Sequence, residues 1–232
     1  MFLIFIWTCL LFSYVLGNTE KIIFTGPPPA DIQSSDPPVD YSHLQSLTPR
    51  NNMIRTYVEA ESPNNVPRDG KPSWILLEGL RESQRYEVRV CWAATQPTMF
   101  NLGVYEPESV VTDSELLSEL SAYAVLLQEK AGSDIDVPSP ILGPDIGGSV
   151  LLLRILTTAE FHTGNHTLMG DAPPVFVDII MDPFLLNILP RSLLPTVAYI
   201  VVVAIASWFI GNSISSWIGQ AIAKPRQNEK YQ

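Results

Sequence analysis

Residues 85–93 read RYEVRVCWA, and the alternation of apolar and polar side chains along them predicts a β-strand. Four apolar or aromatic side chains share one face of this strand: Tyr86, Val88, Val90 and Trp92. Glu87, Arg89 and Cys91 fall on the other face. Such a pattern is typical of an antiparallel strand with one face against a core.

The segment before this strand predicts how the strand joins its neighbour. In WILLEGLRESQRYEV (74–88), Leu80 precedes Tyr86 by six residues. This spacing is typical of the corner between two strands of fibronectin-like and immunoglobulin-like sandwiches, where a tyrosine hydroxyl bonds to the corner backbone. Five further runs have strand character: MIRTYVEA (53–60), SWILLEGL (73–80), MFNLGVYE (99–106), SVLLLRILTTAEF (149–161) and PVFVDIIM (174–181). The chain is therefore expected to be mainly β and to form an immunoglobulin/fibronectin-like β-sandwich.

One segment between these strands has the periodicity of a helix. TDSELLSELSAYAVLLQEKAG (112–132) begins with Thr112 and Glu115 at capping-box spacing. Four large side chains then recur at helical intervals: Leu116, Leu120, Tyr123 and Leu127. We expect one inserted helix, at about 113–130, lying across an open edge or face of the sandwich.

Both ends of the chain are apolar. The run MFLIFIWTCLLFSYVLG (1–17) predicts a signal peptide cleaved between Gly17 and Asn18, although an uncleaved signal anchor is the alternative. Residues 194–222 form an uncharged run long enough to be a single transmembrane helix. Three basic residues and one acidic residue follow, which predicts a cytosolic tail and a lumenal main part in a single-pass type I protein.

The expected organisation is therefore as follows: signal peptide 1–17, Pro-rich lead-in 18–52, lumenal sandwich 53–190, transmembrane helix 194–222 and cytosolic tail 223–232. The net charge is −10, and without the basic tail it is −12. An acidic domain without a basic run argues against nucleic acid and anionic lipid as partners.

The sequence contains no constellation that predicts catalysis. His162 and His166 are close together, but Gly164 and Asn165 between them favour a hairpin turn over a metal-binding helix. The acidic pairs Asp134/Asp136 and Asp178/Asp182 are interpreted as solvated carboxylates. Because no phosphate loop, nucleophile elbow or cysteine pair at ligand spacing occurs, we expect no enzyme activity, no cofactor and no small-molecule substrate.

Two residues are candidates for covalent modification, one by glycosylation and one through its thiol. Asn165 begins the sequon Asn165-His166-Thr167, so we expect a glycan there if the segment is lumenal. Cys91 becomes the one cysteine of the mature chain once Cys9 leaves with the signal peptide, so no intrachain disulfide can form. The Cys91 thiol is either sheltered beneath the helix or a neighbouring strand, or in a mixed disulfide or tight contact with another subunit.

The transmembrane run contains a ladder of small residues. Ser207, Gly211, Ser215, Gly219 and Ala223 recur every four residues, which places them on one inclined stripe of a helix. Small side chains allow close helix contact in a bilayer. The stripe is therefore a candidate contact with a partner helix, although small residues are also common in membrane helices that have no such partner.

Two stretches resemble a known family: EGLRESQRYEVRVCWAATQPTMF (78–100) and VDIIMDPFLLNILPRSLLPTVAYI (177–200). These stretches, together with the order of signal peptide, β-rich domain and single span along the chain, resemble the fungal Pga-type subunit of glycosylphosphatidylinositol (GPI) mannosyltransferase II. The resemblance implies a non-catalytic, glycosylated protein of the endoplasmic reticulum membrane. It also implies a polytopic mannosyltransferase as partner, which holds the catalytic residues and adds the second mannose to the GPI precursor.

Two other classes share this layout. A cargo receptor or an adhesion-type binding protein of the secretory pathway would have the same topology, but it is expected to carry structural disulfides and a sorting tail. A lumenal hydrolase or isomerase would need a set of acid, base or nucleophile that the sequence does not present.

Overall fold

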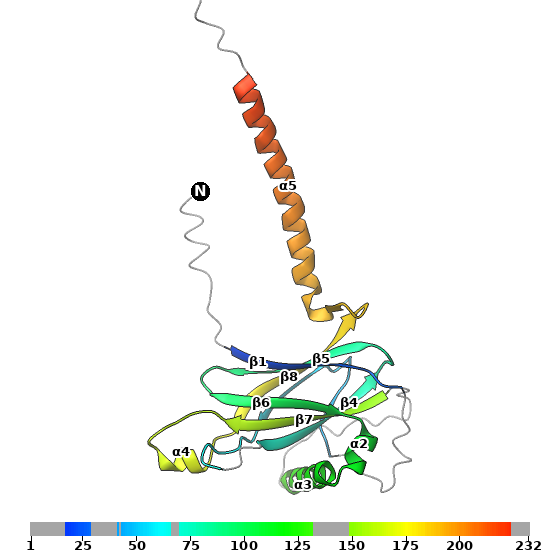
Figure 1. Cartoon of the computed structure of the whole chain (residues 1–232), viewed down its shortest axis with the longest axis vertical. Helices are drawn as coiled ribbons and strands as arrows, with labels where there is room; N and C mark the ends of the chain where they lie inside the picture. The colour runs from blue at the N-terminus through cyan, green and yellow to red at the C-terminus, as the bar shows by residue number, and fades with distance from the viewer. Residues whose placement is uncertain (1–16, 29–40, 42, 66–69, 132–148, 224–232) are drawn as a thin grey trace, which may run out of the picture.

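The computed structural model describes residues 17–28, 41, 43–65, 70–131 and 149–223. Within these ranges the chain forms two packed sheets, four α-helices and one short 3₁₀ helix (Figure 1). The expected residues Asp134 and Asp136 lie outside the described ranges, as do most of the predicted signal peptide and the tail from residue 224.

The strands form two sheets in which almost every neighbouring pair is antiparallel. Sheet A has the order β1 (Gly17–Thr25), β5 (Arg85–Ala93), β8 (Val175–Leu185) and β3 (Met53–Val58), and β9 (Leu189–Pro190) pairs with β8. Sheet B has the order β2 (Ser46–Leu47), β4 (Lys71–Leu80), β7 (Ser149–Ala159) and β6 (Thr98–Tyr105). The six predicted strands are all present, which confirms the mainly β prediction.

The inner faces of the two sheets form the main core. Val88 and Val90 of β5 are fully buried, as are Val177 and Ile179 of β8 in sheet A. They share one apolar cluster with Leu77 and several other side chains of sheet B, so the two sheets pack as a sandwich. The alternation seen in residues 85–93 therefore arises because one face of β5 lies on this core.

Sheet B is buried on its other face as well. The helices α2 (Pro107–Thr112) and α3 (Ser114–Ala131) cover it, and a second apolar cluster contains Trp74, Leu76, Leu120 and Leu152. The four predicted helical side chains all belong to this cluster or pack against it, which confirms the helix and its buried stripe. Burial on both faces explains why β4 and β7 are nearly continuous apolar runs rather than alternating ones.

The start of α3 differs from the predicted capping box. The Asp113 carboxylate, and not Thr112, accepts the N–H groups of Glu115 and Leu116 at 2.9 and 3.3 Å. The Thr112 hydroxyl instead donates to the carbonyl of Glu108 within α2. Because α2 continues to Thr112, that residue is helical and cannot serve as the extended N-cap of the next helix.

The predicted corner between β4 and β5 is present. The hydroxyl of Tyr86 accepts the Arg81 N–H at 2.9 Å, and the Tyr86 side chain is only 1% exposed. Its ring stacks on Phe24 of β1 at a centroid distance of 5.7 Å. Gly26 is required here, since a Cβ atom on it would lie 2.2 Å from the Arg81 carbonyl oxygen. The corner therefore binds β1, β4 and β5 together.

The sandwich begins earlier in the chain than the sequence predicted. Residues 18–52 were expected to form a lead-in, but β1 pairs with β5 over its whole length, from Gly17 opposite Ala93 to Thr25 opposite Arg85. Ile22 and Phe24 pack against the main core, and the ladder to β5 provides partners for the backbone of β1. The domain therefore includes β1 and the short β2 as well as residues 53–190.

The last elements lead out of the sandwich. After β8 and β9, the 3₁₀ helix η2 (Arg191–Leu193) runs into α5 (Leu194–Ala223), which projects from the side of sheet A (Figure 1). Helices α2 and α3 lie on the opposite side of the sandwich, with α4 (His166–Gly170) also away from α5. Sheet A is thus the layer next to α5.

Candidate functional site

Helix α5 has the length and composition of a membrane span. It contains 30 residues, which corresponds to about 45 Å of helix, whereas the hydrocarbon core of a bilayer is about 30 Å thick. Within the stretch Arg191–Gln220, an 18-residue window has a mean hydropathy of 2.3, and none of this window is buried against the sandwich. This agrees with the predicted single transmembrane helix at 194–222.

The predicted small-residue stripe is open in the structure. Ser207, Gly211, Ser215 and Gly219 all lie on α5 and are exposed. A Cβ atom built on Gly211 or Gly219 would meet no described atom within 4 Å, so another helix could approach the backbone there. The stripe remains a prediction, because its partner is not part of the structure.

Polar side chains tie the start of α5 to the outer face of sheet A. We call this group the junction cluster, and it consists of Lys21, Glu87, Arg89, Asp182 and Ser192. The Asp182 carboxylate accepts the backbone N–H of Ser192 at 3.0 Å, and Arg89 donates to the Ser192 hydroxyl at 3.1 Å. The Arg89 guanidinium also lies 3.8 Å from Asp182 and 3.7 Å from Glu87. Lys21 of β1 pairs with Glu87 at 3.3 Å.

The two carboxylates of the junction cluster are shielded from solvent, whereas Lys21 and Ser192 are exposed. Asp182 and Glu87 are only 3% and 5% exposed, so the interpretation of Asp182 as a solvated carboxylate was wrong. Buried carboxylates require partners, and here Arg89 lies close to both of them. Because Ser192 belongs to η2, these contacts fix the turn that leads into α5 relative to β5 and β8.

Sequence reasoning placed Glu87 and Arg89 on the outer face of β5 but did not find their partners. Asp182 and Ser192 are ten residues apart and meet only because β8 turns back into β9. The opposite charges of Glu87 and Arg89 on one strand face were the one available signal that this face is not simply solvated, since a solvated face does not need paired charges.

Cys91 lies on the same outer face, farther along β5. It is a free thiol of intermediate exposure, and the Thr19 hydroxyl approaches its sulfur at 3.6 Å. Of the two shelters expected for this thiol, the helix is wrong, because α3 packs on sheet B. The neighbouring strands β1 and β8 flank Cys91 instead. In β8, Asp178 lies opposite Cys91 and forms a bidentate pair with Arg55, at 2.6 and 2.9 Å. Hydrogen bonds from Arg55 lower the pKa of Asp178, although partial desolvation opposes this shift.

Asn165 lies on the far side of the sandwich from α5. The segment between β7 and β8 is not the predicted hairpin turn, because it contains the helix α4, for which Asn165 is the N-cap. The Asn165 side chain is exposed, and its oxygen accepts the Thr167 N–H at 3.1 Å. The sequon is therefore accessible, and its glycosylation remains a prediction.

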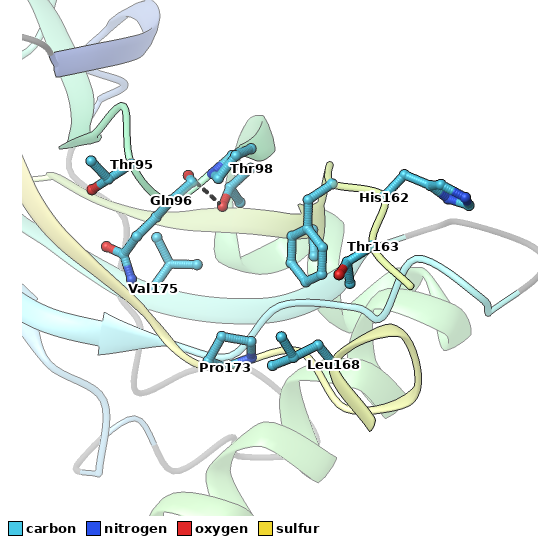
Figure 2. A pocket seen from close by; sticks show the side chains of 11 residues that line it. Thr95, Gln96, Thr98, His162, Thr163, Leu168, Pro173 and Val175 are labelled. Atoms are coloured by element: carbon cyan, nitrogen blue, oxygen red, sulfur yellow. Dashed lines mark hydrogen bonds between the residues drawn. The ribbon is translucent and has the colours of Figure 1, made fainter. Parts of the chain in front are cut away.

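A pocket of about 260 Å³ lies beside this segment (Figure 2). Its apolar wall includes Phe161, Leu168 and Val175. The Gln96 side chain in it donates to the Pro174 carbonyl at 3.4 Å and accepts the Phe176 N–H at 3.3 Å, so its polar groups hold the start of β8. His162 points away from the other lining side chains in Figure 2. This arrangement places no acid and base pair around a substrate position.

The remaining predicted residues are not gathered into a site. Among the described ranges, no three His, Cys, Asp or Glu side chains are grouped so that they could hold a metal ion. Gly17 and Asn18 lie at the start of β1, where Asn18 pairs with Trp92, so the strand can begin at the predicted cleavage point. Whether cleavage occurs remains a prediction.

Comparisons with known proteins identify one family. Residues 8–129, just over half of the chain, match the family model Pga1, described as GPI-mannosyltransferase II co-activator. The match includes the first of the two stretches that resembled this family and ends before the second. Neither the curated proteins nor the solved structures contain a match to this chain. The chain therefore belongs to the Pga1 family of GPI-mannosyltransferase II co-activators.

Proposed function

We propose that this chain is the non-catalytic subunit that stabilises the catalytic mannosyltransferase of GPI mannosyltransferase II in the endoplasmic reticulum membrane. It is then required for addition of the second mannose to the GPI precursor. The family match over residues 8–129 is the observation that carries this proposal, because a co-activator acts through a catalytic partner.

We further propose a single-pass type I arrangement for the chain. The signal peptide is removed after Gly17, α5 spans the membrane, and the basic tail stays in the cytosol. The sandwich is then lumenal, and Asn165 carries a glycan. A protease test on sealed microsomes examines this arrangement: a tag placed after Gln232 is expected to be digested while the sandwich is protected. Protection of the tag would reverse the orientation.

The partner in this proposal is polytopic, so the chain can meet it both in the membrane and outside it. Within the membrane, the stripe of Ser207, Gly211, Ser215 and Gly219 is the proposed contact, since its small side chains permit close approach. Outside the membrane, the junction cluster holds the sandwich in a defined position relative to α5. A rigid attachment of this kind allows the sandwich to present the same face to the partner each time.

Depletion of the chain tests the proposed function. We expect GPI precursors with a single mannose to accumulate, and the full-length chain to restore elongation when it is expressed again. Accumulation of a precursor without mannose would instead indicate the first mannosyltransferase, and normal precursors would contradict the proposal. Purification in mild detergent is expected to recover a multi-spanning glycosyltransferase with the chain.

A further inference from the structure

The hairpin between β8 and β9 exposes an apolar tip that the sandwich does not use. Leu186 and Ile188 are 91% and 79% exposed, and Leu185 is 38% exposed. Leu186 and Asn187 have positive φ angles of 52° and 58°, as a tight hairpin turn of this kind requires. Asparagine and glycine suit such positions, whereas leucine does not. Neither core packing nor turn preference therefore explains the leucine at this position.

The tip is held firmly in place by the neighbouring corner. The Asn187 side-chain oxygen accepts the Arg85 N–H at 2.9 Å, and its amide donates to the Ser83 carbonyl at 2.8 Å. Gln84 donates to the Phe184 carbonyl at 3.2 Å. These bonds fix both the base and the turn of the hairpin, so Leu186 and Ile188 project from a rigid support.

The tip is also confined to the neighbourhood of the membrane. Leu194, the first residue of α5, follows Ile188 by six positions, and even a fully extended chain of this length spans only about 20 Å. The chain between them is not extended, because η2 is helical and the junction cluster fixes Ser192. Figure 1 shows the hairpin beside the base of α5.

We propose that the tip formed by Leu185, Leu186 and Ile188 inserts into the interfacial layer of the leaflet that α5 enters. Apolar side chains that stand next to a span gain by leaving water for this layer. Arg85 is exposed, and its guanidinium donates to the Asn187 carbonyl of the tip at 3.2 Å. Arg191 is also exposed and follows Ile188 by three positions. Long basic side chains at such positions extend to lipid phosphates. Lipid fits the tip better than protein does, since three side chains are far fewer than the roughly 20 residues on each side of a stable protein interface.

This insertion does not conflict with the acidic charge of the domain. The net charge of −12 outside the tail disfavours attraction to anionic lipid, but the tip is apolar and is already brought to the bilayer by α5. Zwitterionic lipid is therefore sufficient. With α5 and the tip as two points of attachment, the sandwich cannot turn freely about the axis of the span.

Fluorescence of the full-length chain in phosphatidylcholine vesicles tests the proposal. Cys9 and Cys91 are replaced by serine, and one cysteine is introduced as Leu186→Cys and labelled with a polarity-sensitive dye. Ile188→Cys provides a second position. The matched control is Val125→Cys on α3, which is also apolar and 54% exposed but lies on the opposite side of the sandwich from α5. Membrane integration is checked separately by resistance to alkaline extraction.

We expect the dye at 186 and at 188 to emit at shorter wavelength than the dye at 125, and to be quenched by lipids that carry a nitroxide near the headgroup. Emission like that of the control, with quenching by aqueous iodide, would place the tip in water and overturn the proposal. A shift that occurs only when the catalytic partner is reconstituted as well would also overturn it, because the tip would then bind protein. The inference rests on α5 as a span and uses no mannosyltransferase readout, so its failure leaves the proposed function standing.

Discussion

Replacement of Tyr86 by phenylalanine tests whether the β4–β5 corner contributes to stability as its geometry indicates. The substitution removes only the hydroxyl, so the packing of the ring against Phe24 and the core is kept. The Arg81 N–H then loses the acceptor that lies 2.9 Å away, in a partly buried position. The corner is the best site for this test because one atom accounts for the whole difference.

The substitution removes two hydrogen bonds of the hydroxyl: the one it accepts from the Arg81 N–H, and a longer one that it donates to the Gln84 side-chain oxygen at 3.3 Å. The loss of the acceptor for the Arg81 N–H accounts for most of the expected cost. A partly buried donor left without its acceptor costs about 1–3 kcal/mol of unfolding free energy. For a domain of this size, each kcal/mol lowers the melting temperature by roughly 2–4 °C. We therefore expect Tyr86→Phe to melt several degrees below the wild-type chain.

Thermal unfolding of the full-length protein in detergent, followed by tryptophan fluorescence, to which the buried Trp74 contributes, measures this change. Tyr57→Phe is the matched control, since Tyr57 lies on the outer face of sheet A and is 67% exposed. Loss of its hydroxyl is expected to change stability by less than about 0.5 kcal/mol. Equal melting temperatures for the wild type and both variants would refute the reasoning, as would an equal loss in the two variants.

Three further predictions concern the outer face of sheet A and the span. Cys91→Ser is expected to keep the complex intact, since the thiol is a half-buried surface group; loss of a partner band on non-reducing gels would instead reveal a mixed disulfide. Gly211→Leu is expected to release the partner from detergent extracts while Val201→Leu does not; full recovery with both would mean that the sandwich alone holds the complex. The pKa of Asp178 is lower in the folded chain than in the unfolded chain, because Arg55 favours the ionised carboxylate. The pair therefore contributes its full stabilisation of the folded state above the ordinary aspartate pKa of about 3.9, and this contribution is lost as the pH falls through the lowered pKa. The difference in melting temperature between wild type and Asp178→Asn should therefore shrink below about pH 4, and a constant difference would contradict this.

The parts of the fold that follow a simple periodicity could be predicted from the sequence. Strand β5 alternates because one face meets the core, and α3 repeats its apolar residues because one stripe meets sheet B. The Leu80 to Tyr86 spacing predicted the corner because its hydrogen bond is local in the chain. In each case the residues that specify the structure lie within a few turns or strand positions of one another.

Two of the missed parts depend on contacts between separate segments, and the third depends on a helix that was not predicted. Strand β1 lies between a predicted signal peptide and a Pro-rich run, and only its ladder to β5, about 70 residues away, gives its backbone partners. The choice of Asp113 over Thr112 as N-cap depends on where α2 ends. The burial of Asp182 depends on the path of the chain back through β9. Local pattern could not decide the pairing of β1 or the burial of Asp182, because their partners lie in other segments of the chain. The N-cap is a local feature, and it was missed because α2 was not predicted.

The corner and the membrane end of the molecule are one connected structure. The turn that donates the Arg81 N–H to Tyr86 inside the core also offers the Ser83 carbonyl to Asn187 on the outside. Gln84 in that turn bonds both to the Tyr86 hydroxyl and to the Phe184 carbonyl at the base of the hairpin. Local unfolding of the corner should therefore disorder the hairpin tip before it disorders α3, which packs on the other sheet. Under the proposed insertion of the tip, the interior of the sandwich therefore determines the position of the surface that contacts lipid.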